Sequence, residues 1–337
     1  MSVSLRSLRA HVVPSDSGAV GRYRAIFPAE ALAQSIQEPF VQQRRGLGGE
    51  VPVYAEAEGA EVLVVNRPVA WAVVEQLRAW RGRGCAIVVD VDDDYGAHPV
   101  INGIDNDACV AACEIADMVT ATTQRLLDVY ATHGRARLLP NRLHESTLGQ
   151  PRDSDGQTLG WAGVVISREN DFEGRGAAIA DAAEDAGWRI LVIGPGYHVE
   201  RAFDGAEVES TGFLDFDGYH QALNKLDIGV VPLADNDFSA AKSALKGLEY
   251  AAHGVPFVAS PSQAYEELAA AGVGLLAATP RDWRRELKRL MGDSDLRAEL
   301  AAHGVEFAAQ QTYGAYAEDW SEAWDAAVKH RQGDPAA

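Results

Sequence analysis

The segment from residue 226 to residue 260, LDIGVVPLADNDFSAAKSALKGLEYAAHGVPFVAS, holds the side chains best suited to bind an anion. A buried strand leads into a polar loop, and a helix is expected to begin at about residue 238, with Ser239 or Asp237 as its N-cap. Lys242 and Ser243 would then lie in the first turns, beside the free N–H groups of the helix start. A helix start with a lysine and a hydroxyl suits a diphosphate.

Glu249 would lie on the same face of that helix, two turns beyond Lys242. At 1.5 Å per residue, the two side chains would be about 10 Å apart along the axis. A carboxylate at that distance can bind the two hydroxyls of a ribose while the helix start binds phosphates. The spacing therefore predicts a site for a nucleoside diphosphate.

Four carboxylates, Asp90, Asp92, Asp93 and Asp94, stand at the end of the apolar run VVDVDDDY. Three interpretations compete. Asp90 and Asp92 would fit an Asp-x-Asp site for a metal-bound sugar diphosphate, since hard cations take oxygen ligands. Alternatively, Asp92 or Asp93 orients an acceptor hydroxyl, or the cluster is solvated or caps a helix. We favour the second interpretation, because adjacent like charges cost stability and are poorly explained by structure alone.

These residues must be positioned by a fold in which short aliphatic strands alternate with helices. Such alternation is typical of parallel, doubly wound α/β architecture, in which ligands bind beyond the carboxyl ends of the strands. The strands are expected at Leu8–Val13, Val51–Ala55, Glu61–Val65, Cys85–Val91, Met118–Thr120, Arg137–Leu139, Thr158–Ala162, Arg189–Ile193, Ala206–Glu209, Ile228–Pro232, Pro256–Ala259 and Gly274–Leu276. Helices are expected between them, among others at Pro28–Gln37, Val69–Arg81 and Asp105–Ala116.

A polar stretch without apolar periodicity, residues 143–157, predicts a linker between two such domains. The predicted domains are residues 1–148 and 149–311, followed by a last helical segment at 312–331. Similarity between the two halves is architectural, and no short repeat is visible.

The amino-acid composition excludes several classes of protein. Thirty Lys and Arg against 49 Asp and Glu give a net charge of −19, which argues against a nucleic-acid-binding surface. Cys85, Cys109 and Cys113 are few and lack metal-ligand spacing, so they are expected in the core of a protein from a reducing compartment. No signal peptide or apolar run of about 20 residues is present, which predicts a cytoplasmic protein without a membrane span.

The run FSAAKSALKGLEYAAHGVPFVAS resembles the donor-binding segment of GT-B glycosyltransferases, specifically the retaining, family-4-like group. In that group a helix carries a Glu-x7-Glu motif followed by Gly-x-Pro and a small-residue stretch. Glu249 and the run GVPFVAS match its second half, whereas Ala241 stands where the first glutamate is expected. The Phe-x-x-x-Lys-Ser spacing of residues 238–243 is similar to a variant branch of the group.

The resemblance extends over nearly the whole chain. It implies two facing Rossmann-like domains, with the last helix crossing back to the first. It also implies a phosphate-binding arginine after the first strand of the donor domain, at Arg168 or Arg175. The further donor-binding residues it implies are Glu249, Ser243, Ser239, Phe238, Phe213, Leu214, Gly163, Gly18 and Gly21.

By this resemblance, the protein is expected to transfer a sugar from a UDP- or GDP-sugar to an acceptor hydroxyl, with retention and without metal or a further cofactor. Lys242, Arg168, Asp92 and Asp93 are the expected catalytic residues. A sugar-nucleotide epimerase or phosphorylase on the same scaffold, and a non-catalytic nucleotide-sugar-binding protein, remain as alternatives. The acceptor is open among protein, glycan, lipid-linked and small-molecule hydroxyls, with nucleic acid unlikely on charge grounds.

Overall fold

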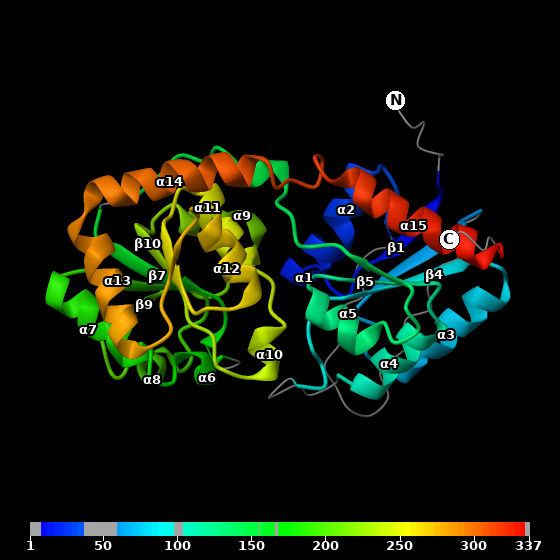
Figure 1. Ribbon diagram of the computed structural model, residues 1–337, viewed down its shortest axis with the longest axis horizontal. Coiled ribbons are helices and arrows are strands. Elements are labelled where there is room, and N and C mark those ends of the chain that lie inside the picture. Colours follow the sequence, from blue (N-terminus) through cyan, green and yellow to red (C-terminus); the bar gives the residue numbers. More distant parts are fainter. Residues whose placement is uncertain (1–7, 37–58, 98–103, 155, 166–167, 334–337) are drawn as a thin grey trace. The chain divides into compact units, whose positions relative to one another are not determined.

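The computed structural model describes residues 8–36, 59–97, 104–154, 156–165 and 168–333, which fold into two compact units (Figure 1). Unit 1 comprises Met1–Arg142, Ala241–Ser243 and Tyr313–Ala337. Unit 2 comprises Leu143–Ala240 and Ala244–Thr312. The expected linker at residues 143–157 belongs to unit 2 and contains a short 3-10 helix, Glu145–Thr147.

Unit 1 is built on a parallel sheet with the strand order β2-β1-β3-β4-β5-β6. Its inner strands are buried along their whole length, as expected when helices cover both faces. The strand predicted at Val51–Ala55 lies outside the described residues. The strands are β1 (Ala10–Val13), β2 (Ser35–Ile36), β3 (Val62–Asn66), β4 (Ala86–Val91), β5 (Met118–Ala121) and β6 (Ala136–Leu138).

The helices of unit 1 depart from the prediction in one place. The residues after β1 enter a helical run from Ala19, and the helix predicted at Pro28–Gln37 ends at Ala31. Part of this run is a π-helix, a form that is rare and frequent at functional sites. The helices are α1 (Ala19–Gly21), η1 (Arg22–Ile26), α2 (Phe27–Ala31), α3 (Trp71–Gly82), α4 (Asn106–Ile115), α5 (Gln124–Tyr130) and α15 (Ala317–Arg331).

Helix α15 returns to unit 1 after the chain has formed unit 2, and it packs on β3, β4 and β5. Trp320 and Trp324 on this helix are each 1% exposed, so its apolar face completes the core of unit 1. Tyr313, expected inside this helix, precedes it and donates its hydroxyl to the carbonyl of Tyr23.

Unit 2 repeats the architecture with a second parallel sheet of order β12-β11-β10-β7-β8-β9. The two parallel sheets with their helices confirm the doubly wound α/β fold. The strands of this unit are β7 (Thr158–Ala162), β8 (Arg189–Ile193), β9 (Glu209–Ser210), β10 (Ile228–Val231), β11 (Phe257–Ala259) and β12 (Leu275–Leu276).

The helix predicted from residue 238 to Gly254 is broken in the structure. Residues 241–244 interrupt it, so Lys242 and Ser243 do not lie in a helical turn. Asn236 accepts a hydrogen bond from the Ser239 N–H at 2.8 Å and thus caps the first piece, a role expected for Ser239 or Asp237. The helices of unit 2 are α6 (Glu169–Phe172), α7 (Gly176–Ala186), α8 (Val199–Ala202), α9 (Phe216–Leu223), α10 (Asp237–Ala240), α11 (Leu245–Ala252), α12 (Gln263–Ala270), α13 (Pro280–Gly292) and α14 (Ser294–Ala309).

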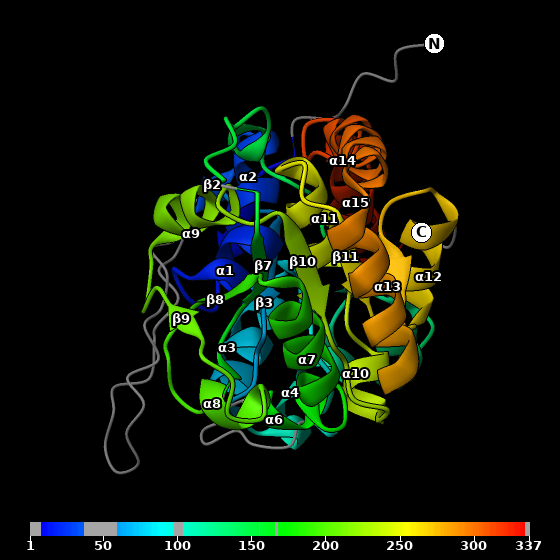
Figure 2. The ribbon, with the colours of Figure 1, turned by 90° about the vertical axis from the view of Figure 1, so that its left-hand side faces the viewer.

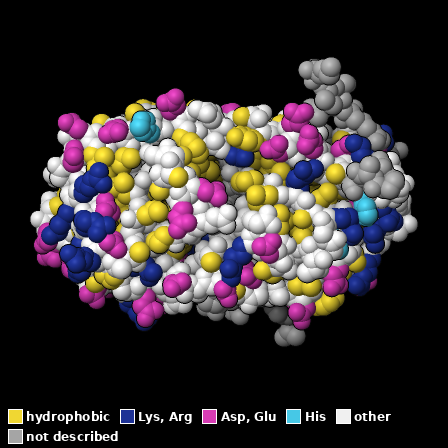
Figure 3. Space-filling model, viewed as in Figure 1, with side chains coloured by type: hydrophobic (Ala, Val, Ile, Leu, Met, Phe, Trp, Pro, Cys, Tyr) yellow, Lys and Arg dark blue, Asp and Glu magenta, His cyan; other side chains and the backbone are white. Residues whose placement is uncertain are grey.

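Helix α13 carries the strongly basic sequence RRELKR, and it lies beside α7 (Figure 2). Arg284 pairs with Asp181, and Lys288 pairs with Asp185 at 2.8 Å. Figure 3 shows acidic and basic side chains intermixed at this end of the molecule. The basic face is therefore a solvated face paired with its neighbouring helix.

Two further findings concern the whole described chain. Cys85, Cys109 and Cys113 are free and buried. Among the described residues, no helix has the length and apolar character required to cross a bilayer.

Candidate active site

Each sheet has one point at which the chain reverses direction along the strand order, and ligands bind beside such points in doubly wound folds. In unit 1 the point lies between β1 and β3, and in unit 2 it lies between β7 and β10. The turns that leave these four strands hold most of the predicted site residues.

In unit 1, the turn after β1 is held by the side chain of Asp16. Its carboxylate accepts hydrogen bonds from Gly18 N at 2.8 Å and Gly21 N at 3.2 Å. A Cβ on Gly21 would lie 1.8 Å from the carbonyl oxygen of Asp16, so only glycine fits there. Ser15 connects this turn to Asn66 at the end of β3, at 2.7 Å.

The Asn66 amide leads to Asp90, whose carboxylate is fully buried at the end of β4. Arg24 of the π-helix donates to both oxygens of Asp90, at 2.9 and 2.7 Å, and Thr120 donates to one of them at 2.6 Å. Arg24 also donates to Asn141 and lies 4.8 Å from the centre of the Trp320 ring. The oxygens of Asp90 thus face protein donors, which contradicts an Asp90-Val91-Asp92 metal site.

Asp92 and Asp93 lie just beyond this network and form a second cluster with Arg67. Arg67, which has a φ of 55°, donates to Asp92 at 2.8 Å and to Asp93 at 3.4 Å. Tyr95 donates to Asp92 at 2.7 Å. Burial opposes ionisation, but the Arg67 charge and these hydrogen bonds hold the pKa of Asp92 below its usual value. Asp92 and Asp93 are thus carboxylates whose positions are fixed by neighbours.

The short segment Ala241–Ser243, which interrupts the predicted helix, packs with unit 1. Lys242 forms an ion pair with Asp93. Ser243 accepts a hydrogen bond from Asn141 at 2.8 Å, and Thr123 donates to the Ala241 carbonyl at 3.1 Å. Two predicted catalytic residues, Lys242 and Asp93, are thus in direct contact.

In unit 2, the turns after β7 and β8 approach each other through glycine backbone. Gly163 has a φ of 146° and its N–H donates to the Ile193 carbonyl at 2.9 Å. A Cβ on Gly194 would lie 1.9 Å from the Gly163 carbonyl oxygen. A Cβ on Gly163 itself would lie 2.7 Å from the Trp161 ring, so a larger residue at this predicted donor-binding position would displace that ring.

Arg168, the predicted phosphate-binding arginine, lies at the start of α6. Its guanidinium is 5.1 Å from the centre of the Phe238 ring and 3.9 Å from the Asp171 carboxylate. Asp171 accepts hydrogen bonds from Ala234 N at 2.8 Å and from the Ser239 hydroxyl at 3.1 Å. These contacts join the turn after β7 to the loop after β10 and bring Arg168, Phe238 and Ser239 together.

Helix α11 starts at the same edge of the sheet. Lys246 in its first turn donates to the Ala162 carbonyl and lies 5.3 Å from the centre of the Trp161 ring. On the same helix, Glu249 is buried and accepts a hydrogen bond from Tyr219 at 2.7 Å. Burial raises the pKa of the Tyr265 hydroxyl, and the nearby charge of Glu249 raises it further.

The loop with the predicted donor-binding residues Phe213 and Leu214 lies between β9 and α9. Phe213 is 76% exposed and Leu214 is 42% exposed, whereas most large apolar side chains of unit 2 are buried. Gly212 has a φ of 77°, and its N–H donates to the Gly194 carbonyl at 3.0 Å. Phe213 and Leu214 thus stand in solvent on a loop anchored to the turn after β8.

The sequence reasoning did not identify Arg24, Asp171 or Tyr219. Each of these residues acts through a partner distant in sequence, and none belongs to a recognisable local motif. His98, which follows the acidic run of residues 90–94 in the sequence, lies outside the described residues. His253 is buried and hydrogen-bonded to His220 and Asn224, which gives it a structural role at the end of α11.

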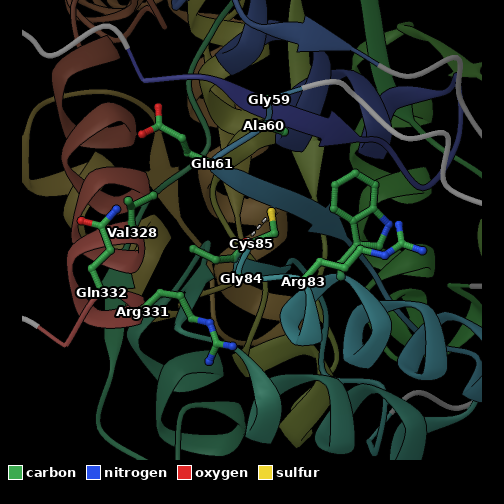
Figure 4. Close-up of a pocket in the computed structure, with 11 residues that line it drawn as sticks. Gly59, Ala60, Glu61, Arg83, Gly84, Cys85, Val328, Arg331 and Gln332 are labelled. Atoms are coloured by element: carbon green, nitrogen blue, oxygen red, sulfur yellow. Dashed lines mark hydrogen bonds between the residues drawn. The ribbon is translucent and has the colours of Figure 1, made fainter.

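A cavity of about 660 Å³ opens at the opposite, amino-terminal edge of the unit 1 sheet (Figure 4). Glu61, Arg83 and Cys85 line it from the sheet and from α3, and Arg331 projects into it from the end of α15. Arg9 pairs with Glu61, and Arg331 donates to the Arg81 carbonyl at 2.6 Å. The cavity is remote from the switch point of this sheet.

Comparison with known proteins relates part of the chain to a family and the fold to solved structures. Residues 158–293 match the family described as glycosyl transferases group 1. No curated protein matches the sequence. Among solved structures, the chain resembles WaaG, a glycosyltransferase involved in lipopolysaccharide biosynthesis, with 14% identity, a TM-score of 0.63, and coverage of 94% of this chain and 99% of that one.

Two other solved structures show the same fold. Sucrose-phosphate synthase from Thermosynechococcus elongatus has 17% identity and a TM-score of 0.56, over 83% of this chain and 75% of that one. HepE from Anabaena, in complex with UDP, has 14% identity and a TM-score of 0.56, over 78% of each chain.

The two parallel sheets and these likenesses show that the chain has the GT-B fold, the fold of these glycosyltransferases. Within this fold, residues 158–293, less than half of the chain, match glycosyl transferases group 1.

Proposed function

We propose that the protein transfers a sugar from a nucleoside-diphosphate sugar to an acceptor hydroxyl with retention of anomeric configuration. The carbon–oxygen bond to the departing diphosphate breaks, and a bond from the same carbon to the acceptor oxygen forms. The hydroxyl proton passes to the departing phosphate. The acceptor class stays open among proteins, glycans, lipid-linked and small molecules, and the net charge of −19 disfavours a nucleic acid.

The observation that carries this proposal is the group of side chains at the switch point of unit 2. Arg168 lies against Phe238 beside the turn after β7, the α11 start adjoins the same turn, and Glu249 faces Tyr219 further along α11. In our proposal, Arg168 and the helix start bind the diphosphate, and Glu249 binds the ribose. The exposed Phe213 and Leu214 lie beside the base.

UDP is the donor nucleotide we favour over GDP. HepE was solved in complex with UDP, and the pneumococcal O-GlcNAc transferase GtfA, with which this chain shares the fold, was solved with UDP and GlcNAc. The proposed donor therefore is a UDP-sugar, bound by residues 149–311, while residues 1–148 bind the acceptor. Residues 312–331 return to the first of these domains.

The proposed reaction uses side chains in place of a metal ion. The carboxylate of Asp90 is saturated by Arg24, Asn66 and Thr120. Lys242, Ser243 and Arg168 would instead stabilise the negative charge that grows on the departing diphosphate, as preorganised electrostatics. Asp92 and Asp93 would orient the acceptor, since Arg67 and Tyr95 fix their positions.

Turnover by single variants tests the assignment. Lys242→Ala and Arg168→Ala should each lower kcat about 100-fold, the usual cost of removing one preorganised charge-stabilising donor. Asp93 keeps its contact with Arg67 in the first variant, so folding should be preserved. Lys288→Ala, which removes an exposed charge on α13, is the control. Wild-type rates in both site variants would contradict the proposed site.

The donor can be identified without knowing the acceptor. The purified protein is incubated with a pool of UDP-, GDP-, ADP- and TDP-sugars, and the retained nucleotide is measured by mass spectrometry. Retention of a UDP-sugar with only slow hydrolysis supports the proposal. Conversion of the donor into an epimer without any acceptor would instead indicate an epimerase.

A further inference from the structure

The side chain of Asn141 connects Ser243 to the buried Arg24, and all three residues belong to unit 1. Asn141 is itself buried. Its Nδ2 atom lies 2.8 Å from the Oγ atom of Ser243, and its Oδ1 atom lies 3.1 Å from the Nη1 atom of Arg24. The amide thus lies between a hydroxyl, which can donate or accept a hydrogen bond, and a guanidinium, which can only donate.

The guanidinium of Arg24 determines which way this amide faces. An amide with its NH2 group toward Arg24 would set two donors against each other, so Oδ1 faces Arg24 and Nδ2 faces Ser243. Arg24 is fixed in turn, because it donates two hydrogen bonds to Asp90 and one to the Leu139 carbonyl, at 2.8 Å. The orientation of Asn141 is therefore set by a buried ion pair of unit 1.

The orientation of the amide determines the role of the Ser243 hydroxyl. Because Asn141 donates to Ser243, the hydroxyl oxygen is the acceptor in that hydrogen bond, and the hydroxyl proton points elsewhere. An oxygen that already accepts a hydrogen bond is a stronger donor, since successive hydrogen bonds polarise one another. The neighbouring Lys242 carries an ammonium group, which also can only donate. Two successive side chains are thus donors, which suits an anionic ligand.

We propose that Asn141 is a positioning residue that makes Ser243 a hydrogen-bond donor to the diphosphate of the nucleotide. This inference rests on the proposed function, in which Lys242 and Ser243 stabilise the departing diphosphate. It adds the direction of each hydrogen bond, which runs from Arg24 through Asn141 and Ser243 to a phosphate oxygen. An ionised phosphate oxygen accepts hydrogen bonds and has no proton to donate, so this direction alone fits the ligand.

Asn141→Asp tests the direction of these hydrogen bonds, because it replaces the NH2 group by an oxygen at nearly constant size. The carboxylate still accepts from Arg24, but it takes the proton of Ser243 for its own hydrogen bond. We expect calorimetry to show that UDP binds about 10-fold more weakly, which corresponds to the loss of one hydrogen bond to a charged group. Uridine, which lacks the diphosphate, should bind the variant and the wild type equally. Weaker binding of uridine as well would indicate a general distortion and overturn the inference.

The negative charge that Asn141→Asp introduces also repels a diphosphate, and a double-mutant cycle with Ser243→Ala separates the two effects. If Asn141 acts through the hydroxyl, Asn141→Asp should cost little further UDP affinity in a protein that already carries Ser243→Ala. Repulsion alone would lower the affinity equally in both backgrounds and would overturn the inference. Gln150→Glu, the same change of amide to carboxylate at an exposed position, is the matched control and should bind UDP as the wild type does.

The half-buried Ser243 offers a test that does not depend on the folding of the Asn141 variant. Ser243→Ala should bind UDP about as weakly as Asn141→Asp, whereas Ser243→Thr keeps a hydroxyl and should restore the affinity. Equal UDP affinity in Ser243→Ala and Ser243→Thr would overturn the donor role of the hydroxyl.

Failure of this inference can be distinguished from failure of the proposed function. A wild-type protein that binds neither UDP nor GDP would contradict the proposed function and this inference with it. Weaker UDP binding in Arg168→Ala, together with unchanged binding in Asn141→Asp, would overturn the positioning role of Asn141 alone.

Discussion

Four hydrogen bonds from Arg24, Asn66 and Thr120 converge on the Asp90 carboxylate, which is inaccessible to solvent. Asp90→Ala would leave Arg24 buried without its counter-charge. Because breaking one side of a buried ion pair is strongly unfavourable, we expect the free energy of unfolding to fall by about 3–5 kcal/mol. Urea denaturation followed by tryptophan fluorescence measures this loss.

Glu75→Gln provides the comparison, since Glu75 pairs with Arg78 on an exposed turn of α3. An exposed pair of this kind contributes about 0–1 kcal/mol. Equal stability losses in the two variants would show that the buried Arg24–Asp90 pair contributes no more to stability than the exposed pair does.

The buried pair of His220 and His253 should make stability depend on pH. Burial lowers the pKa of His220 to about 4 and that of His253 to about 3. The unfolded chain, with histidines near 6.5, then binds more protons than the folded one below that pH. The free energy of unfolding should be at its maximum above pH 6.5. It should fall by about 3 kcal/mol for one such histidine as the pH decreases toward 4.

Urea midpoints measured from pH 7.5 to pH 4 in the wild type and in a variant with both histidines changed to glutamine check this expectation. In the variant, the urea midpoint should depend much less on pH between pH 6.5 and pH 4. His303→Gln, at an exposed position of α14, should keep the pH dependence. A slope unchanged in the double variant would assign the pH dependence to other groups.

At the scale of single residues, the sequence was informative where a motif is local. The spacing within residues 238–260 predicted a donor-binding segment, and the match to glycosyl transferases group 1 covers these residues. The sequence was uninformative where two interacting residues are far apart in the chain. Tyr219 and Glu249 are 30 residues apart, and Arg24 and Asp90 are 66 apart, so no local pattern links them.

At the scale of elements, the strands were predicted well and the helix at the donor segment was not. Buried parallel strands are continuous apolar runs, and β7 and β8 have the predicted bounds. The break between α10 and α11 depends on Asp93, Thr123 and Asn141, which contact residues 241–243 from more than 100 positions away. Helix propensity is a property of the local sequence, so it cannot predict a break that depends on distant contacts.

The close approach of two turns gives a prediction at this scale. Gly194→Ala should displace the Gly163 turn, because the added Cβ would lie 1.9 Å from the Gly163 carbonyl oxygen. We expect UDP affinity to fall at least 10-fold, together with a stability loss larger than backbone conformation alone would cause. Calorimetry and thermal unfolding measure the two effects.

Gly187→Ala separates these causes. Gly187 also has a positive φ, 70°, as the C-cap of α7, but no atom lies within 4 Å of its added Cβ. The substitution should cost about 1 kcal/mol of stability and leave UDP binding unchanged. Equal loss of affinity in both variants would rule out a specific role for the Gly163–Gly194 contact.

At the scale of the whole molecule, unit 1 depends on residues that follow unit 2 in the chain. A variant that ends at Thr312 lacks α15, including Trp320 and Trp324, which are each 1% exposed. Because this helix covers β3, β4 and β5, its removal should expose the core of unit 1. We expect strong binding of a hydrophobic dye and loss of the near-UV circular dichroism of unit 1.

A variant that ends at Gly333 keeps α15 and should behave like the full chain. A variant ending at Thr312 that stays monomeric and binds no dye would show that unit 1 is complete without α15.

The placement of α15 also has a consequence for biosynthesis. During translation, the strands β1 to β6 leave the ribosome first, yet the tryptophans that close their core are made only after all of unit 2. Unit 2, whose strands lie within one nearly continuous stretch, can reach its native state earlier. The nascent amino-terminal half would meanwhile expose an apolar sheet face, which makes it a natural client of chaperones that bind hydrophobic surfaces.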